Sequence, residues 1–310
     1  MSKPDLVIVG SVALDSIRTP FGERSRILGG AATYSSVAAS VFCTPGLVGV
    51  VGDDFPQEHE LFLSQRGIDL DGLEHKPGQT FHWKGRYEGN MNAAITEETQ
   101  LGVFGDFSPT IPEAYRDADY LFLGNIHPQL QLDVLDQMKP DVFSAADTMN
   151  LWINTTGDLL KKVIRRVRLM LLNDEEARSI SGKSNLLDAA DEIRAMGPSI
   201  VAIKKGEHGA MVFSDQGVSL IPAVPLSTAK DPTGAGDTFA GGMMGCLARF
   251  DLSTRAELAG AALMGSILAS FTVENFSVTG LACATPQSIN ARQEMLRAAM
   301  DVHIRPVEQN

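Results

Sequence analysis

Short apolar runs alternate along the chain with longer stretches of helical period. The short runs, rich in β-branched residues or leucine, predict strands buried on both faces: Leu6–Gly10, Leu47–Val51, Tyr120–Gly124, Val142–Ala146, Leu169–Leu172 and Ile200–Ile203. The stretches between them predict crossover helices: Ala31–Phe42, Gln57–Arg66, Gln129–Met138, Asp158–Arg166 and Leu186–Met196. Buried strands joined by helices are typical of a parallel sheet covered on both sides. The pattern therefore predicts a layered α/β fold with a mostly parallel central sheet.

The last two apolar runs differ from the others. Ala210–Ser214 and Val218–Ile221 are separated only by the turn signal Asp215-Gln216-Gly217. This spacing predicts an antiparallel hairpin at the edge of the sheet. From Asp237 onward, helical patterns dominate the chain.

One segment departs from the alternation of strands and helices. From Phe81 to Glu88, apolar and polar residues alternate strictly, which predicts a strand with one dry face and one wet face. A second candidate strand, Gln100–Phe104, follows it, and five of the chain's 20 aromatic residues lie between residues 81 and 107. This enrichment favours a small projecting sheet that serves as a lid or a subunit contact. A satellite core beneath a loop is the alternative.

Composition narrows the classes of function. The 310 residues are 44% hydrophobic and 21% charged, enough for a large core, and they carry a net charge of −12. That charge would repel nucleic acid and anionic membranes, so neither is an expected partner. No run of 18 uninterrupted apolar residues and no secretion signal is visible. Three widely spaced cysteines match no metal-binding spacing, so we expect free, buried thiols in a reducing cytoplasm.

The most informative stretch is DPTGAGDTFAGG, residues 231–242. Its glycines let backbone amides point outward, and the helix of small residues that follows adds a positive N-terminal dipole. This predicts an anion-binding loop with Asp237 at its rim, ionised and able to accept a proton. Phosphoryl transfer to a hydroxyl needs that combination. A tight turn in which Asp237 merely caps the helix is the structural alternative.

Two familiar phosphate-binding motifs are excluded by spacing. Ser179–Ser184 ends like a Walker A loop, but the position five residues before Gly182 is Ala177 where that motif requires glycine. A dinucleotide fingerprint that begins at Gly234 would need a small residue where the chain has Phe239. There is accordingly no P-loop, and a nicotinamide cofactor is disfavoured.

The stretch DPTGAGDTFAGG, residues 231–242, resembles the C-terminal signature of the ribokinase-like, or PfkB, carbohydrate and nucleoside kinases. Gly29-Gly30-Ala31-Ala32-Thr33 resembles the diglycine element of the same family. The resemblance extends over essentially the whole chain. It implies a single α/β/α ribokinase-like domain, residues 1–310, with a small β lid formed by about residues 11–30 and 78–107. It also implies transfer of the ATP γ-phosphoryl group to a hydroxyl of a small acceptor, with Mg²⁺ brought by the nucleotide.

The resemblance implies a role for individual residues. It assigns Asp237 as the base; Gly234, Ala235 and Gly236 as the anion hole; Asp15, Gly29 and Gly30 as contacts of the acceptor; Lys204, Gly206, Gly209 and Thr233 as contacts of the nucleotide; and Asn173 and Glu176 as residues that organise water around Mg²⁺. Taken singly, most of these positions also fit a turn or the first turn of a helix. Some family members need a monovalent cation such as K⁺ near the segment matching Asp231 and Thr233.

Two departures from the family pattern bear on the acceptor. The spacing around Asp147 differs from that of many relatives, which argues against a binding role there. Gly30-Ala31-Ala32-Thr33-Tyr34 replaces the Gly-Lys-Gly-Ala-Asn of ribokinase itself, which argues against ribose.

Three functions therefore remain open. A sugar kinase is the favoured interpretation. The alternatives are a nucleoside kinase, whose base would stack on Phe81, Trp83 or Tyr87, and a non-catalytic nucleotide or sugar sensor. The same aromatic residues could instead bury against a second subunit, which would make a homodimer through the lid.

Overall fold

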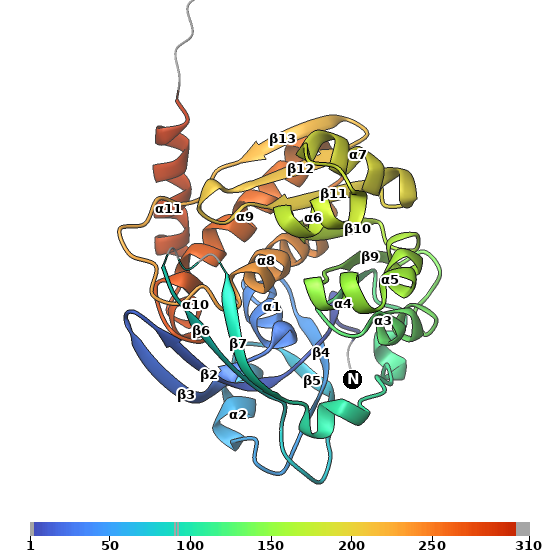
Figure 1. Ribbon diagram of the computed structural model, residues 1–310, viewed down its shortest axis with the longest axis vertical. Coiled ribbons are helices and arrows are strands. Elements are labelled where there is room, and N and C mark those ends of the chain that lie inside the picture. Colours follow the sequence, from blue (N-terminus) through green and yellow to red (C-terminus); the bar gives the residue numbers. More distant parts are fainter. Residues whose placement is uncertain (1–2, 90, 92, 302–310) are drawn as a thin grey trace, which may run out of the picture.

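A nine-stranded sheet forms the centre of the molecule (Figure 1). The computed structural model describes residues 3–89, 91 and 93–301; the ends of the predicted 1–310 domain, and residues 90 and 92 of the predicted lid segment, lie outside them. Across the sheet the strand order is β13 (Gly217–Ile221), β12 (Ala210–Ser214), β11 (Ile200–Lys204), β10 (Leu169–Asn173), β9 (Phe143–Ala146), β8 (Tyr120–Leu123), β1 (Leu6–Val9), β4 (Pro45–Val51) and β5 (Asp69–His75). The strands from β5 to β11 are parallel, and β12 is antiparallel to both neighbours. The layered α/β fold and the edge hairpin are confirmed.

Helices cover both faces of this sheet because its central strands are apolar on both sides. In β1, Leu6 and Ile8 belong to one buried cluster, and Val7 and Val9 belong to the other. The first cluster packs under α1 (Ala31–Ala39), α2 (Gln57–Gln65), α8 (Ala235–Phe250), α9 (Arg255–Val273), α10 (Thr279–Ala282) and α11 (Pro286–Ala299). The second packs under α3 (Pro128–Leu135), α4 (Asn150–Thr155), α5 (Gly157–Ile164), α6 (Asp174–Ser181) and α7 (Leu186–Met196).

A separate four-stranded sheet, here called the lid, lies along one side of the body (Figure 1). Its order is β3 (Gly22–Gly29), β2 (Ala13–Thr19), β6 (His82–Tyr87) and β7 (Ala94–Gln100). The pair β2 and β6 is parallel, and the other two pairs are antiparallel. The lid thus joins two distant parts of the chain, and its strands fall within the two predicted segments.

Two predictions about the lid are wrong in detail. The second strand is β7, whereas Gly102–Asp106 forms a 3₁₀ helix that begins at Gly102, where φ is +51°. Every residue of β7 is exposed, so the hydrophobic pattern carried no signal for a strand that is held by backbone pairing with β6. The predicted wet face of β6 is also partly dry, because His82 is buried with its Nε2 2.9 Å from Ser16 Oγ.

The hydrophobic helix α9 meets the length and hydropathy expected of a membrane span. Half of its apolar window is buried within the fold, and the helix packs against α8 and β13. These contacts are those of a core helix in a globular protein.

The expectation of three buried thiols is corrected by the structure. All three cysteines are free, but only Cys246 is buried, while Cys43 is half-buried and Cys283 is exposed. Burial raises the pKa of the Cys246 thiol to about 11 and that of Cys43 to about 12. A reducing cytoplasm stays a prediction.

Candidate active site

Three neighbouring strands bring polar residues to one edge of the central sheet. Asp147 directly follows β9, Asn173 ends β10 and Lys204 ends β11. Asn173 and Lys204 are partners in the parallel register, so their side chains start from adjacent positions. Because the carboxyl ends of parallel strands share an edge, this is where an open α/β sheet binds its ligand.

The predicted anion-binding loop reaches the same edge. A Cβ placed on Gly236 would lie 3.2 Å from Lys204 Nζ, which brings the first turn of α8 next to the end of β11. Helix geometry leaves the first amides of α8 without acceptors inside the helix, so the N–H of Gly236 can face an anion, whereas the N–H of Asp237 also lies beside its own carboxylate. The N–H of Ala235 is different, because it donates to the carbonyl of Pro232 at 3.1 Å. Ala235 therefore stabilises the turn of the predicted anion hole, and its N–H is not free to bind an anion.

Gly234 gives this loop its shape. It caps α8 in the left-handed region, with φ of +74°. Its backbone lies against the ring of Tyr34 in α1, so closely that a Cβ would be 2.4 Å from three ring carbons. Only glycine combines that dihedral angle with that approach.

Asp237 lies in the first turn of α8, where the helix dipole meets the cleft. Asp237 is half-buried as a residue. Burial, and then the charge of Asp147, raise the pKa of Asp237 to about 7, although Lys204 acts in the opposite direction. A carboxylate with a pKa near neutrality is suited to take a proton from an alcohol.

Lys204 and Asp147 form an ion pair beside Asp237. Lys204 Nζ donates to Asp147 Oδ2 at 2.6 Å, and the side chains of Lys204 and Asp147 are only 16% and 6% exposed. The other oxygen of Asp147 accepts the N–H of Thr148 at 2.9 Å. Although burial lowers the pKa of Lys204, the nearby charges of Asp147 and Glu176 raise it above its ordinary value.

Asn173 and Glu176 contact each other at the start of α6. The side chain of Asn173 accepts the N–H of Glu176 at 2.8 Å, and Glu176 Oε2 accepts the N–H of Asn173 at 2.8 Å. These two bonds form a capping box, so Asn173 and Glu176 also have the purely structural role of starting helix α6. Burial and the charge of Asp147 nevertheless raise the pKa of Glu176 to about 7, which places its carboxyl within the same cluster of charges.

The predicted acceptor contacts meet at the base of the lid. Asp15 in β2 is 4% exposed, and a Cβ on Gly29 would lie 2.0 Å from Asp15 Oδ2. Burial, and then the charge of Asp231, raise the pKa of Asp15 to about 8, with a smaller contribution from Asp237. Gly30 follows with φ of +95° and leads directly into α1. The structure thus brings Asp15, the two glycines and Asp237 into one region.

The lid touches the signature segment through Tyr87. Thr233 Oγ1 donates to Tyr87 Oη at 3.2 Å, and Tyr87 is 9% exposed. Trp83 lies over Gly85 in the same strand, where a Cβ would be 2.1 Å from the indole ring, and its Nε1 donates to Thr96 at 3.1 Å. The aromatic face of β6 therefore has partners within the chain. A homodimer through this face stays a prediction.

The segment that contains Gly206 and Gly209 forms a tight turn after β11. Residues Gly206–His208 make one 3₁₀ turn, and the N–H of Lys205 donates to the carbonyl of Gly209 at 2.7 Å. The turn begins two residues after Lys204, at the same edge of the sheet. A role in nucleotide binding stays a prediction.

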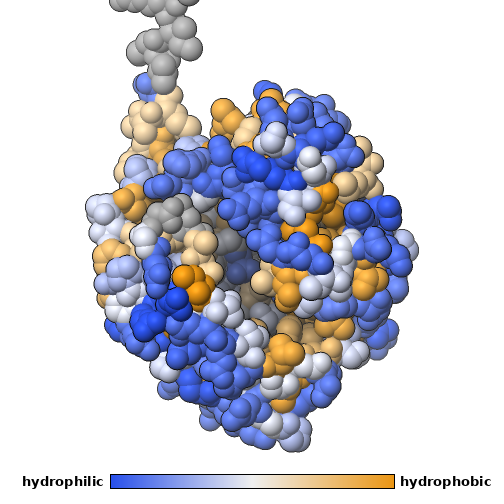
Figure 2. All heavy atoms as spheres, viewed as in Figure 1, coloured by the Kyte–Doolittle hydropathy of each residue, from blue (hydrophilic) through white to orange (hydrophobic). Residues whose placement is uncertain are grey.

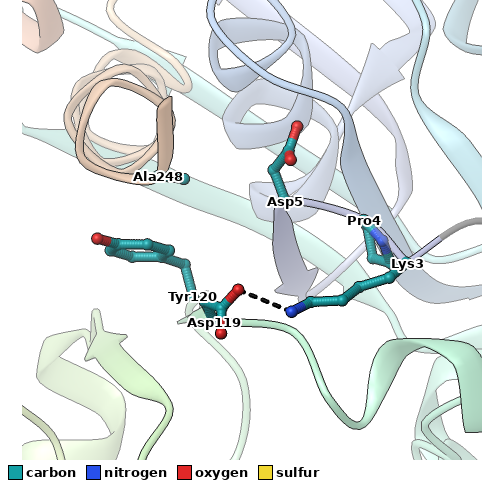
Figure 3. A pocket seen from close by; sticks show the side chains of 6 residues that line it. All are labelled: Lys3, Pro4, Asp5, Asp119, Tyr120 and Ala248. Atoms are coloured by element: carbon teal, nitrogen blue, oxygen red, sulfur yellow. Dashed lines mark hydrogen bonds and ion pairs between the residues drawn. The ribbon is translucent and has the colours of Figure 1, made fainter. Parts of the chain in front are cut away.

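The body and the lid enclose a hollow in this face of the molecule. Figure 2 shows it at the centre of the view, between the lid strands and α4. A separate cavity of about 280 Å³ lies at the other end of the parallel strands, at the amino ends of β1 and β8. Figure 3 shows the side chains of Lys3 and Asp119 pointing toward each other there. That cavity shares no residue with the site.

Sequence reasoning discounted Asp147 and assigned no contact to Tyr34. The position of Asp147 directly after a buried strand indicates a site residue, but its spacing differs from that of the family motif and argues against that role. Tyr34 is buried, and its hydroxyl has no hydrogen-bond partner in the described part of the chain. Burial, and then the charge of Asp231, hold the pKa of Tyr34 well above its ordinary value.

Known proteins resemble this chain in both sequence and fold. The profile of the pfkB family carbohydrate kinases matches residues 3–283. The chain is 33% identical over 254 residues to a cytidine kinase of Thermococcus kodakarensis, an alignment that covers 77% of this chain and 87% of that enzyme.

Solved structures extend the likeness to the whole architecture. A nucleoside kinase of Burkholderia thailandensis in complex with ADP-inosine superposes with a TM-score of 0.77 at 20% identity, covering 94% of this chain and 95% of that one. A fructokinase of Vibrio cholerae superposes with a TM-score of 0.75 at 18% identity, covering 94% and 98%. The fold is thus common to nucleoside and sugar kinases and does not select the acceptor. By its sequence, the chain belongs to the pfkB family of carbohydrate kinases, ATP-binding phosphotransferases that act on an alcohol group.

Proposed function

We propose that this protein is a nucleoside kinase that transfers the γ-phosphoryl group of ATP to a hydroxyl of a nucleoside. The observation that carries this proposal is the 33% identity to a cytidine kinase over most of both chains. The sequence pattern had favoured a sugar acceptor, and the comparison supports the nucleoside alternative better.

The charges at the sheet edge support phosphoryl transfer. Asp237 is the proposed base, and its pKa of about 7 leaves a useful fraction ionised at neutral pH. The ammonium group of Lys204 lies close to the start of α8, so it and the amides there would together stabilise the negative charge of the phosphoryl group. A non-catalytic sensor would have no need of a base beside such an anion site.

The lid supplies surfaces that suit a nucleoside. Asp15 at its base is proposed to accept hydrogen bonds from ribose hydroxyls, and Gly29 and Gly30 allow a close approach of the sugar. The aromatic side chains of β6 offer flat faces on which a base could stack. Closure of the lid would exclude water from the reacting groups.

Mg²⁺ is proposed to arrive with the nucleotide. Within the described residues, no group of three His, Cys, Asp or Glu side chains is placed to hold a metal ion. The oxygen donors of Asn173 and Glu176 suit Mg²⁺, which usually keeps several waters, so these residues would hold it through water. Bound Mg²⁺ would neutralise phosphate charge.

A monovalent cation such as K⁺ also fits this part of the structure. Asp231 is fully buried, and its Oδ2 has no hydrogen-bond partner in the described part of the chain. Its other oxygen accepts the N–H of Thr233 at 2.9 Å. An unpaired buried carboxylate oxygen is a suitable ligand for such an ion.

Residues Gly206, Gly209 and Thr233 are proposed to border the nucleotide.

A panel of acceptors tests the proposed function. Cytidine, uridine, adenosine, inosine, guanosine, ribose and fructose would each be incubated with Mg·ATP, with ADP formation measured and the product identified by mass spectrometry. We expect a nucleoside monophosphate from at least one nucleoside, at a kcat/KM well above that for either free sugar. Turnover of free sugars alone would contradict the proposal, and ATP binding without turnover of any acceptor would favour the sensor.

A further inference from the structure

We propose that Lys204 is a catalytic residue that contacts the transferring phosphoryl group, and that Asp147 is a positioning residue that fixes Lys204 against the anion-binding loop. The inference rests on phosphoryl transfer itself and is independent of which nucleoside or sugar is the acceptor. It assigns a role to Asp147, which motif spacing had argued against.

The first support is the position of the ammonium group. Lys204 Nζ lies 2.6 Å from Asp147 Oδ2 on one side and next to Gly236 on the other, where a Cβ would be 3.2 Å away. The amide of Gly236 belongs to the first turn of α8, whose free N–H groups form the anion site. An anion held by those amides would therefore also be within reach of Lys204.

The second support is the way in which Asp147 is held. Its two oxygens have separate partners, the N–H of Thr148 at 2.9 Å and Lys204 Nζ at 2.6 Å. The backbone behind it is fixed by Gln131, whose side-chain amide donates to the carbonyls of Asp147 at 3.0 Å and Gly124 at 2.9 Å. With Asp147 buried and hydrogen-bonded through both oxygens, the lysine has a defined place. A group that stabilises a transition state must be placed in this way before the substrate arrives.

The third support is the balance of charge. The carboxyl groups of Asp147, Glu176 and Asp237 all act electrostatically on Lys204. Three acidic groups would repel an incoming γ-phosphate. The positive charge of the buried lysine among them offsets that repulsion. Together these carboxylates outweigh the effect of burial and keep the pKa of Lys204 above its ordinary value.

The proposed step is balanced without any proton transfer by the lysine. The bond between the γ-phosphorus and the β–γ bridging oxygen breaks, and the acceptor oxygen forms a new bond to that phosphorus. The acceptor proton goes to Asp237. Lys204 stays protonated throughout and lowers the energy of the negative charge that is spread over the oxygens in transit.

Binding of a transition-state mimic tests the role of Lys204. Wild type and Lys204→Met would be titrated with ADP alone and with ADP plus Mg²⁺ and aluminium fluoride, which imitates the phosphoryl group in transit. We expect the variant to bind ADP almost as wild type does, to lose the additional affinity given by aluminium fluoride, and to lower kcat by about 10²–10³-fold. Lys204→Arg, which keeps the charge, should recover part of kcat.

A double-mutant cycle tests the positioning role of Asp147. Asp147→Asn alone should lower kcat by about tenfold, because the lysine loses a charge-assisted hydrogen bond. In the Lys204→Met background the same change should lower kcat no further on the high-pH plateau, where the direct effect of Asp147 on the pKa of Asp237 no longer matters and Asp147 acts only through the lysine. The double variant also removes the buried carboxylate that Lys204→Met alone would leave unpaired, so it remains a folded test protein.

The pair of Lys139 and Asp119 provides the matched control. These residues also form an ion pair, but at the opposite edge of the sheet, where β8 begins. Lys139→Met and Asp119→Asn should leave kcat and binding of the mimic unchanged.

Two results would overturn the proposal. One is an affinity for ADP and aluminium fluoride that is unchanged in Lys204→Met. The other is an equal loss of affinity for ADP and for the mimic, which would limit Lys204 to general nucleotide binding. Both readouts use ADP without an acceptor, so they stand apart from failure of the nucleoside proposal, which the acceptor panel reveals.

Discussion

The ring of Tyr34 lies against the backbone of Gly234, so that a helix of the body supports the loop predicted to bind phosphate. A Cβ at position 234 would be 2.4 Å from the ring, and the backbone there has φ of +74°. Gly234→Ala should therefore destabilise the protein by about 1–3 kcal/mol and displace the amides of α8. Thermal unfolding and ATP turnover would measure the two effects. A variant with unchanged Tm and kcat would show that the loop tolerates another shape.

Gly260 offers a control for that substitution. It lies within α9, and a Cβ there would meet nothing within 4 Å. Gly260→Ala should keep activity and hold or raise stability, since alanine favours the helix.

Asp237 is expected to be indispensable for turnover. Asp237→Asn keeps the size and the helix position of the side chain but cannot accept the acceptor proton. We expect kcat to fall by about 10²-fold or more while ATP binding stays near wild type and Tm at neutral pH is at or above that of wild type, because the fold no longer buries a carboxyl of raised pKa; calorimetry and steady-state kinetics would measure these effects. Turnover near that of wild type would remove Asp237 from the role of base.

The pH profile of activity should follow the ionisation of Asp237. Because its pKa is raised to about 7, kcat/KM for ATP at excess Mg²⁺ should rise with pH up to about 7 and then level off. In Asp147→Asn the midpoint should move to lower pH, because Asp147 raises the pKa of Asp237 and its partner Lys204 lowers it. A wild-type midpoint near the ordinary value of 3.8 would contradict this assignment.

Asp15 should weaken the fold of the ligand-free protein as pH rises. Its pKa is about 8 in the fold against 3.8 ordinarily, so between these values the folded state holds a proton that the unfolded state has released. The contribution of Asp15 to stability is then complete below pH 3.8 and is lost as pH rises through 8.

Asp15→Asn removes that titration. Its free energy of unfolding, measured in urea, should gain on wild type as pH increases from 5 to 9, where the fold buries the charge of Asp15 near Asp231 and Asp237. Asp215→Asn, in the exposed turn between β12 and β13, should show no such trend. A constant difference between Asp15→Asn and wild type over that range would mean that Asp15 stays ionised.

Tyr87 is expected to hold the lid against the signature segment. Tyr87→Phe keeps the ring but removes the hydroxyl that accepts from Thr233 at 3.2 Å. The loss of one such bond is worth about 1 kcal/mol, so KM for the acceptor should rise by about fivefold with a smaller change in kcat. Thr233→Val should have the same effect, and the two changes together should not add. Full additivity would show that the two residues act separately.

The body of the fold could be predicted because its signals are local. Leu6–Val9 and Ile200–Ile203 are continuous apolar runs that only a doubly covered sheet accommodates, and the structure places both in that sheet. β5 and β7 were missed because their residues are largely polar or exposed and their strands are held by pairing with neighbours. Backbone pairing of that kind leaves little trace in hydrophobic pattern.

The site likewise contains residues with a local sequence signal and residues that meet only through strand pairing. The glycines and Asp237 of the signature lie within a few residues of one another, so their meeting was encoded locally. Lys204 and Asp147 are 57 residues apart and meet only because β9, β10 and β11 are adjacent. Motif spacing measures distance along the chain, and therefore it could not detect a pair that is created by strand order.

The helix α1 imposes a limit on how this enzyme could be re-engineered. Only Gly30 separates it from the end of lid strand β3, and it runs along α8 so closely that a Cβ on Gly241 would be 2.1 Å from the carbonyl oxygen of Ser35. Mutational libraries aimed at new acceptors would therefore damage the phosphate end whenever they alter α1. The lid strand β7, which lies at the edge of its sheet and whose residues are all exposed, is the safer place to diversify.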